Sequence, residues 1–318
     1  MTTSKIPYFK HIYIEKNIKE KATEILEKFK NREIIYIDNY LEIFGRKKQS
    51  FNLQKKNPSL ILAEKKGNFL YPNPPYCQNF GFERSFYTSL ILNCIFDCSY
   101  CFLKGMYNSA NIVFFLNIED FFNALTKEEE NGGFLLFLSY DTDLLAFENI
   151  GGFIHQFYNF LSNHPKITTE IRTKSSNFNS IEDLKPLPNI ILAWSILPCE
   201  IIENFENKTP QLKQRLLAVK KAQEKGWKVR LVFDPIITTG NIEIYEKFLK
   251  EISSYIDTEK ILDISCGNFR MNEKYYKNIS SISPEILSIK TEKEIYKRII
   301  EQIKLTFSQK IVYSIYND

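Results

Sequence analysis

An alternation of apolar strand-like runs and amphipathic helical segments from Ser85 onward constrains the fold of this chain most strongly. The strand-like runs cover residues 87–92, 134–138, 168–171, 190–196, 228–233 and 261–265. Helical periodicity separates several of them, at residues 118–127, 152–161, 210–225 and 243–255. This alternation is typical of parallel βαβ units, so we expect an α/β core of six strands that closes, wholly or partly, as a barrel.

The chain is predicted to divide into an N-terminal lobe, residues 1–84, and a core, residues 85–318, that ends with a helix at 291–308. The lobe has helical spacing at 19–30, strand-like runs at 34–37 and 60–63, and a stiff proline-rich stretch at 71–76. Helix 210–225 has the clearest ends. Thr209 is a suitable N-cap, Pro210 suits the first helical position, and Gly226 ends the helix.

Composition and charge indicate an ordinary folded protein of 318 residues, with 44% hydrophobic and 25% charged residues. The net charge of +4 is too small to imply nucleic-acid binding by itself. The basic residues form short runs that are either solvated surface or a phosphate-binding track: Arg46-Lys47-Lys48, Lys55-Lys56, Lys65-Lys66 and Lys220-Lys221. No signal peptide or run of 18 apolar residues is recognisable, so we expect a cytoplasmic protein with reduced thiols and no membrane partner.

Three of the six cysteines lie within eight residues. Cys94, Cys98 and Cys101 have the spacing C-x3-C-x2-C, with Tyr100 just before the third, whereas the others, Cys77, Cys199 and Cys266, stand alone. In a reducing compartment this spacing indicates a metal site rather than a disulfide framework. Three thiolates on one loop can ligate three irons of a [4Fe–4S] cluster, which leaves the fourth iron open to activate a substrate.

Two other interpretations of the cysteines remain open at this point. One is a zinc site whose fourth ligand is Cys199, Cys266 or a histidine, although zinc sites prefer paired C-x2-C knuckles and this chain has one. The other is three incidental buried thiols. Function in a barrel of this kind sits at the C-terminal ends of the strands. The cysteine loop and residues 139–143, 173–174 and 195–199 are all expected there.

The C-x3-C-x2-C motif resembles that of the radical S-adenosylmethionine (SAM) superfamily, and the chain as a whole resembles the spore photoproduct lyase family. Residues 98–103, CSYCFL, resemble the family's CHYCYL, and residues 12–15, IYIE, resemble its opening VYIEP. Residues 113–121, 196–217 and 232–236 resemble three further family stretches. The resemblance implies a partial (β/α)6 radical SAM barrel that carries a [4Fe–4S] cluster and SAM. It also implies generation of a 5′-deoxyadenosyl radical for lyase repair of thymine-dimer (spore photoproduct) lesions in DNA.

Carried over by position, the resemblance implies roles for individual residues. Cys94, Cys98 and Cys101 would bind the cluster. Tyr100, Thr142, Lys174 and Ser195 would lie beside SAM, with Lys174 paired to its carboxylate, although a lysine at a strand end can also be a solvated loop residue. Arg270 and the basic loops are expected to contact damaged DNA. An electron donor such as flavodoxin or ferredoxin is the implied protein partner.

Three departures from the family pattern concern the end of the reaction and the substrate. Tyr140 stands where the family has a hydrogen-donor cysteine, Phe102 replaces a tyrosine, and a DNA-gripping C-terminal segment is largely missing. Tyr140, Cys199 and Cys266 are therefore candidate catalytic residues that would quench the product radical. Tyr100, beside the cofactor, is a further candidate catalytic residue. The alternatives are a cofactor-packing role for Tyr140 and buried packing for the two cysteines. A radical SAM paralogue with another substrate, or a non-radical metal-binding or electron-transfer protein, also remains open.

Overall fold

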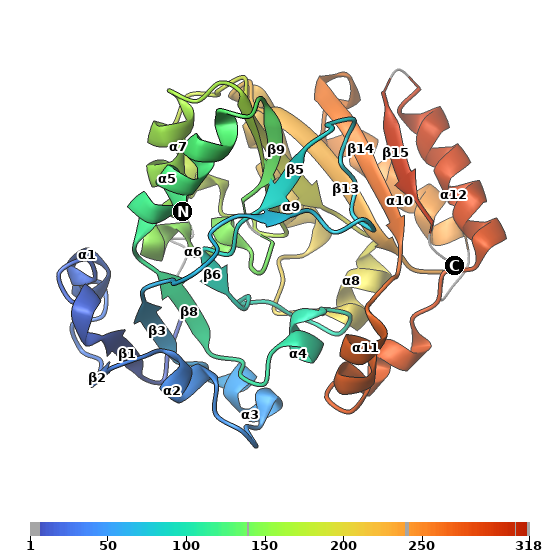
Figure 1. The fold of residues 1–318 in the computed structure, drawn as a ribbon. Coiled ribbons are helices and arrows are strands. Elements are labelled where there is room, and N and C mark those ends of the chain that lie inside the picture. The colour runs from blue at the N-terminus through green and yellow to red at the C-terminus, as the bar shows by residue number, and fades with distance from the viewer. Residues whose placement is uncertain (1–6, 139, 239–241, 309, 317–318) are drawn as a thin grey trace.

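The computed structural model describes residues 7–138, 140–238, 242–308 and 310–316, and its largest feature is a curved eight-stranded sheet (Figure 1). The strand order is β15 (Val312–Ile315), β14 (Ile261–Asn268), β13 (Lys228–Ile236), β11 (Ile190–Ser195), β10 (Ile167–Thr173), β9 (Phe134–Phe137), β5 (Ser85–Tyr87) and β4 (Tyr71–Pro72). All neighbours are parallel except β4, which pairs antiparallel with β5. Because the parallel strands follow chain order, the sheet curls in one direction as a half-barrel. The predicted fold class is confirmed.

Helices connect the parallel strands, as the periodicity predicted. They are α5 (Ile118–Glu129), α6 (Leu144–Gly151), α7 (Phe153–Leu161), α8 (Cys199–Phe205), α9 (Leu212–Glu224), α10 (Glu243–Tyr255) and α12 (Lys293–Thr306). Helix α9 begins two residues later than predicted, because Gln211 and Gln214 form a capping box there. The Thr209 hydroxyl instead accepts a hydrogen bond from Arg215 at 2.7 Å.

A second, five-stranded sheet lies beside the half-barrel, in the order β2 (Ile34–Ile37), β1 (Ile12–Glu15), β3 (Leu60–Ala63), β8 (Ile112–Phe115) and β6 (Ile91–Leu92). Its first three strands come from before residue 84 and its last two from after it. The run at 87–92, expected to be one strand, is divided between the sheets. After Tyr87 the chain leaves the half-barrel, and Ile91–Leu92 pairs antiparallel with β8.

Short elements complete the structure. Three short helices lie in the N-terminal region, α1 (Thr23–Glu27), α2 (Leu41–Phe44) and α3 (Phe51–Lys56), so the helical spacing at 19–30 gives only five α-helical residues. The ribbon β7 (Asp97–Cys98) with β12 (Glu206–Asn207), together with α4 (Leu103–Met106) and α11 (Glu273–Ser280), lies around the cysteine loop. The 3-10 turns are Lys16–Ile18, Phe178–Ile181, Thr258–Lys260 and Pro284–Ser288. In the described part of the chain no helix has both the length and the apolar character to cross a membrane.

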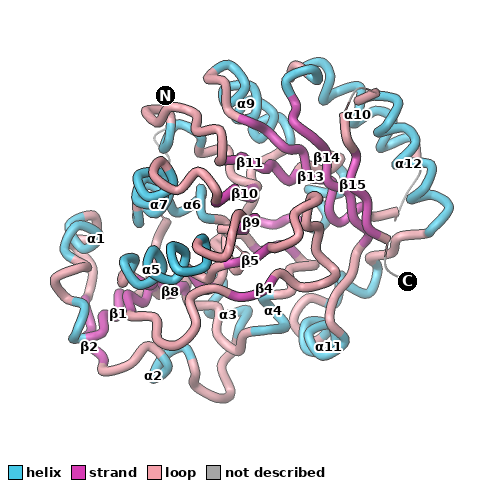
Figure 2. Tube along the Cα trace, turned by 45° about the horizontal axis from the view of Figure 1, so that its top comes forward, coloured by secondary structure: helices cyan, strands magenta, loops and turns pink. Residues whose placement is uncertain are grey.

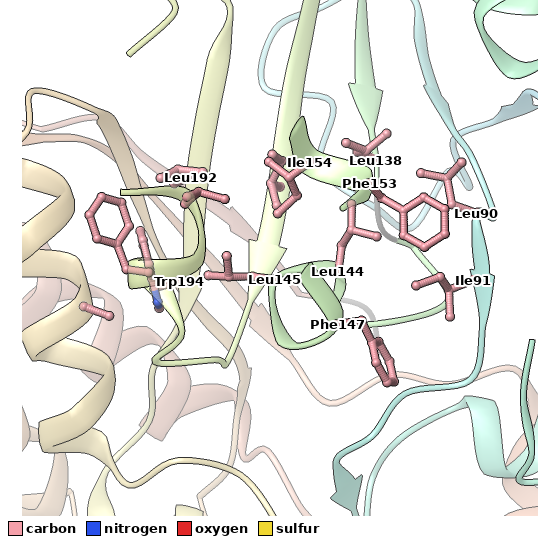
Figure 3. Packing of buried hydrophobic residues seen from close by; sticks show 14 of the residues in the cluster. Leu90, Ile91, Leu138, Leu144, Leu145, Phe147, Phe153, Ile154, Leu192 and Trp194 are labelled. Carbon is pink, nitrogen blue, oxygen red and sulfur yellow. The ribbon is translucent and has the colours of Figure 1, made fainter. Parts of the chain in front are cut away.

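The two sheets share one buried apolar core, and helix α6 joins its parts. Figure 3 shows Leu144 and Phe147 of this helix near Leu90 and Ile91, whereas Leu145 points toward Trp194. The tube in Figure 2 shows the neighbouring strands β10, β9, β5 and β4 in turn. Because α6 follows the loop after β9, this packing fixes the end of a loop that carries predicted site residues.

Candidate active site

One cavity of about 300 Å³ lies at the C-terminal ends of the half-barrel strands. This volume is at the lower end of the range for small-molecule sites, roughly 300–1,000 Å³. Most of the residues predicted for the site line it, namely Cys94, Cys98, Tyr100, Cys101, Tyr140, Thr142, Lys174, Ser195 and Arg270. The structure therefore brings together residues that are up to 176 positions apart, from Cys94 to Arg270.

The cysteine loop begins at Asn93, which has a positive φ of 67°. Asparagine tolerates this left-handed conformation better than most residues. Its side-chain amide donates hydrogen bonds to the carbonyls of Ser109 at 2.7 Å and Asn111 at 2.8 Å. The buried Lys55 ammonium donates to the Cys94 carbonyl at 2.5 Å. One lysine of a predicted basic run therefore supports the cysteine loop.

The rest of the loop is held by a strand pairing and a helix. Cys98 lies opposite Glu206 in the β7–β12 ribbon. The Lys104 ammonium forms an ion pair with Asp97 at 2.8 Å. At Gly105, helix α11 comes so close that an added Cβ would lie 2.3 Å from the Tyr275 carbonyl oxygen. Only glycine allows this approach, which fixes the loop against the C-terminal region.

The chemistry of the three thiols fits a positively charged iron–sulfur centre. Burial raises the pKa of Cys94 to about 12 and also raises the pKa of Cys98. Metal binding deprotonates such thiols, because coordination to a cation offsets the cost of a buried thiolate. Neither Cys199, Cys266 nor any of the three histidines lines the cavity, so none of the fourth ligands expected for zinc lies there. In the described ranges no three His, Cys, Asp or Glu side chains are grouped to hold a single metal ion, whereas a cluster binds each of the three cysteines through a different iron.

Glu206 is the centre of a buried polar network beside the cysteines. It accepts hydrogen bonds from Tyr100 and Arg215, and the Lys174 Nζ atom lies 3.6 Å from its Oε1 atom. Burial alone would raise the pKa of Glu206, but Lys174 and Arg215 lower it below its usual value. The network thus holds two cations around one carboxylate, and Asp143 is a second acidic neighbour of Lys174.

The same network positions Lys174 and Ser195. Burial would lower the pKa of Lys174, but Glu206 and Cys98 raise it, so its ammonium stays charged. Its Nζ atom also lies 5.7 Å from the centre of the Tyr100 ring. Arg215 donates to the Ser195 carbonyl at 3.0 Å, which ties the end of β11 to Glu206.

Asp143 organises the loop after β9. Its carboxylate accepts a hydrogen bond from the Thr173 hydroxyl at 2.7 Å, from the Lys174 N–H at 2.6 Å and from the Ala146 N–H at 3.1 Å. It therefore caps α6 and joins two strand ends. The Thr142 hydroxyl lines the cavity, and among the described residues it is buried without a hydrogen-bond partner. Ser139, the first residue of the predicted stretch, lies outside the described residues.

Aromatic rings form one wall of the cavity. Tyr140 stacks on Tyr87 with ring centres 4.3 Å apart and lies 5.5 Å from Phe102, measured in the same way. The Tyr140 phenol also has the Tyr76 phenol and the Cys77 thiol as hydrogen-bonding neighbours. Tyr140 therefore has contacts with both the cysteine loop and the loop before β5.

The two cysteines predicted as alternative hydrogen donors lie elsewhere. Cys199 is the first residue of α8 and has Glu251 and Lys247 of α10 among its charged neighbours. Cys266 is buried in the apolar core, whereas the preceding Ser265 lines the cavity, as the alternation of a strand requires. Neither thiol is among the residues that line the cavity.

Arg270 lines the cavity but already has protein partners. It forms hydrogen bonds of 3.0 and 2.9 Å with the Asp234 carboxylate and one of 3.0 Å with the Tyr76 carbonyl. Among the basic runs, Lys65 donates to Tyr71, and Lys221 on α9 donates to Asn179. Arg46, Lys47, Lys48 and Lys56 are exposed.

Glu206, Arg215, Asp143 and Cys77 contribute to the site but were given no role from the sequence. A signal existed for the first two, since both lie in the stretch 196–217 that resembles the family. Asp143 lies in a stretch expected at the strand ends, but its links to Thr173 and Lys174 depend on the fold. Cys77 stands alone beside a proline-rich segment, and nothing in its surroundings marks it as a cavity residue.

Comparisons with known proteins agree with this geometry. A family model described as spore photoproduct lyase matches residues 85–310. A cysteine-to-alanine mutant of spore photoproduct lyase, solved with dinucleoside spore photoproduct, has a TM-score of 0.83 at 16% identity and covers 98% of this chain and 100% of that chain. A double mutant with bound AdoMet and the same dinucleoside has a TM-score of 0.80 at 16% identity, with 96% and 99% covered. No curated protein matches the chain.

Proposed function

Because the chain belongs to the spore photoproduct lyase family, we propose that it is a radical SAM carbon–carbon lyase that repairs spore photoproduct lesions in DNA. The observation that carries the proposal is the common cavity of Cys94, Cys98 and Cys101 with the residues expected beside SAM. When bound there, a [4Fe–4S] cluster and SAM supply a 5′-deoxyadenosyl radical. The two relatives described above, which were solved with the dinucleoside lesion, support the same substrate class.

The protein side chains provide binding and orientation in this proposal. The Lys174 ammonium has three N–H donors and is paired with Glu206. Its remaining N–H groups are available for the carboxylate of SAM. The partnerless Thr142 hydroxyl can bond a polar group of the same cofactor. Ser195 is the third polar residue in this group, and its backbone is fixed by Arg215.

The aromatic wall suits a nucleobase lesion. A duplex lesion must be turned out of the base stack before chemistry, and stacking on aromatic side chains is a common way to hold an extruded base. Tyr140, Phe102 and Tyr76 line the cavity and offer such faces. Because Arg270 is occupied by Asp234, we assign backbone contacts first to the exposed basic residues Arg46, Lys47, Lys48 and Lys56.

The electron donor and the cellular location are part of the same proposal. Generation of the radical needs one electron, which we assign to a flavodoxin or ferredoxin. All six cysteines are free thiols, which fits a reducing compartment, and we place the enzyme in the cytoplasm.

Anaerobic reconstitution followed by two measurements tests the proposal. Formation of 5′-deoxyadenosine from SAM by the reduced protein separates a radical enzyme from a metal-binding or electron-transfer protein. Conversion of dinucleoside spore photoproduct to two thymidine units then separates the lyase from other radical SAM enzymes. Formation of 5′-deoxyadenosine without any loss of the dinucleoside would contradict the lyase assignment.

A radical SAM paralogue with another substrate is the second candidate, and Tyr140 is the observation that favours it. The family places a hydrogen-donor cysteine at this position, and a phenol gives up hydrogen to a carbon radical less readily than a thiol. Unless another hydrogen donor lies in the cavity, the last step of lesion repair has no efficient hydrogen donor.

A further inference from the structure

We propose that Cys77 is the hydrogen-atom donor that completes repair, in place of the cysteine that Tyr140 replaces. This inference rests on the proposed function and names a further catalytic residue for it. Cys77 lies in the loop between β4 and β5 and lines the same cavity as the cluster cysteines. Among the lone cysteines, Cys199 and Cys266 lie outside that cavity.

The contact between Cys77 and Tyr140 carries the argument. The Cys77 thiol and the Tyr140 phenol are hydrogen-bonding neighbours, so a thiol lies next to the position where the family has its donor. The cavity around this pair is built for a ligand, since the buried Thr142 hydroxyl that lines it has no partner in the described part of the protein. Cys77 thus brings a thiol from a different loop next to the position of the family's donor cysteine.

The loop that carries Cys77 is fixed by hydrogen bonds to the peptide group between Tyr76 and Cys77. The Cys77 N–H donates to the Pro74 carbonyl at 2.9 Å, and Arg270 donates to the Tyr76 carbonyl at 3.0 Å. Arg270 is itself held by the Asp234 carboxylate. These bonds restrain the thiol at the cavity, and defined geometry is what transfer of a hydrogen atom requires.

The protonation state of Cys77 also fits a donor. Burial raises the pKa of the Cys77 thiol above its usual value, although Arg172 and Arg270 lower it in part. The thiol therefore keeps its hydrogen at neutral pH. A thiolate, in contrast, would have no hydrogen atom to give.

The proposed step transfers a hydrogen atom from the Cys77 thiol to the repaired base. The S–H bond of Cys77 breaks homolytically, and its hydrogen atom forms a C–H bond on the methylene carbon of the thymine radical left after the bridge has split. The sulfur keeps the unpaired electron. One electron from the flavodoxin or ferredoxin donor and one proton from water then restore the thiol. Tyr140, in contact with the sulfur, positions the thiol.

Repair of dinucleoside spore photoproduct in D₂O by the reconstituted holoenzyme tests this step, because a thiol hydrogen exchanges with solvent. The wild-type protein should place one deuterium in the methyl group of the repaired thymine. Cys77→Ala should still form 5′-deoxyadenosine and open the lesion, but it should lose the deuterated product and give adducts with the reductant. Cys199→Ala makes the same chemical change outside the cavity and should match wild type.

The results separate this inference from the proposed function. Unchanged deuterium incorporation and product ratio in Cys77→Ala would overturn the assignment of Cys77 while leaving the lyase function in place. A wild-type protein that never opens the lesion would overturn both. Transfer of the unlabelled substrate hydrogen back from 5′-deoxyadenosine, seen as a repaired thymine without deuterium in wild type, would also overturn the role of Cys77.

Thiol alkylation of the protein without cofactors tests the contact between Cys77 and the substrate independently of turnover. Alkylation of the reduced protein by iodoacetamide, followed by mass spectrometry, measures the reactivity of each thiol. The dinucleoside lesion should slow modification of Cys77 and leave the rate at Cys199 unchanged. Equal rates at Cys77 with and without a saturating concentration of the dinucleoside would contradict contact between this thiol and the substrate.

Discussion

The ammonium nitrogen of Lys174 lies 3.6 Å from a carboxylate oxygen of Glu206, so the lysine expected to bind SAM already has an acidic partner inside the protein. The pair joins the end of β10 to β12, the strand that pairs with the cysteine loop. The pair therefore links the expected SAM site to the strand beside the cysteine loop.

Lys174→Ala should weaken SAM binding about ten- to a hundredfold, because it removes a charge-assisted hydrogen bond of roughly 1.5–3 kcal/mol. Iron and sulfide content should stay at the wild-type level, since Lys174 is not a cluster ligand in this proposal. Calorimetric titration of the reconstituted protein with SAM measures the affinity. An unchanged affinity would assign Lys174 to a purely structural pairing with Glu206.

Glu206→Gln should lower the free energy of unfolding by about 3 kcal/mol, because it removes the buried carboxylate that Arg215 and Lys174 share. Glu119→Gln is a matched control. It removes the same charge from an exposed ion pair with Lys21, N–O distance 2.9 Å, and should cost about 1 kcal/mol or less. Urea denaturation of the two variants gives the comparison. Equal losses would mean that the buried network contributes no more than a surface pair.

Replacing Cys94, Cys98 or Cys101 by Ala should abolish the visible absorbance of the iron–sulfur cluster after anaerobic reconstitution. All three thiols line the cavity, and a site-differentiated cluster needs each of them. Cys199→Ala should retain the wild-type spectrum and about four irons per chain. A complete cluster in the triple Ala variant would rule out this ligand set.

Asp141 should make stability depend on pH. Burial raises the pKa of Asp141 from 3.8 to about 6, although hydrogen bonds with Ser89 and Tyr107 oppose the rise. Between about pH 4 and pH 6 the unfolded chain has released a proton that the folded protein keeps, so stability falls as the pH rises through this range. The full loss is roughly 3 kcal/mol.

Asp141→Asn cannot ionise and should lack this fall. Denaturation midpoints of both proteins, measured at intervals from pH 4 to pH 7, test the expectation. The difference in stability should move in favour of the Asn variant as the pH rises. Two parallel curves across this range would show that Asp141 ionises in the folded protein as easily as in the unfolded chain.

Local sequence patterns were enough to predict several strands and helices of the fold. The strands at 34–37 and 60–63 and the helix at 243–255 have the predicted bounds, because their apolar spacing is regular and turn residues flank them. The run at 87–92 could not be divided from the sequence, since its second half is fixed by pairing with the distant strand β8. The same limit applies to the site. Cys94, Cys98 and Cys101 are neighbours in sequence, whereas the contact of Tyr140 with Cys77 depends on how two loops meet.

Strand β8 has consequences for any shortened form of the enzyme. Its four residues, Ile112–Phe115, are all buried, and it pairs with β3 from the N-terminal region on one side. A chain that began at residue 85 would keep every cluster cysteine but lose β3. The peptide groups on that edge of β8 would be unpaired, and its side chains are apolar. Strands of other molecules could pair with such an edge. We expect such a chain to aggregate, which light scattering would detect. The first 84 residues would thus keep the rest of the enzyme soluble by covering the edge of β8.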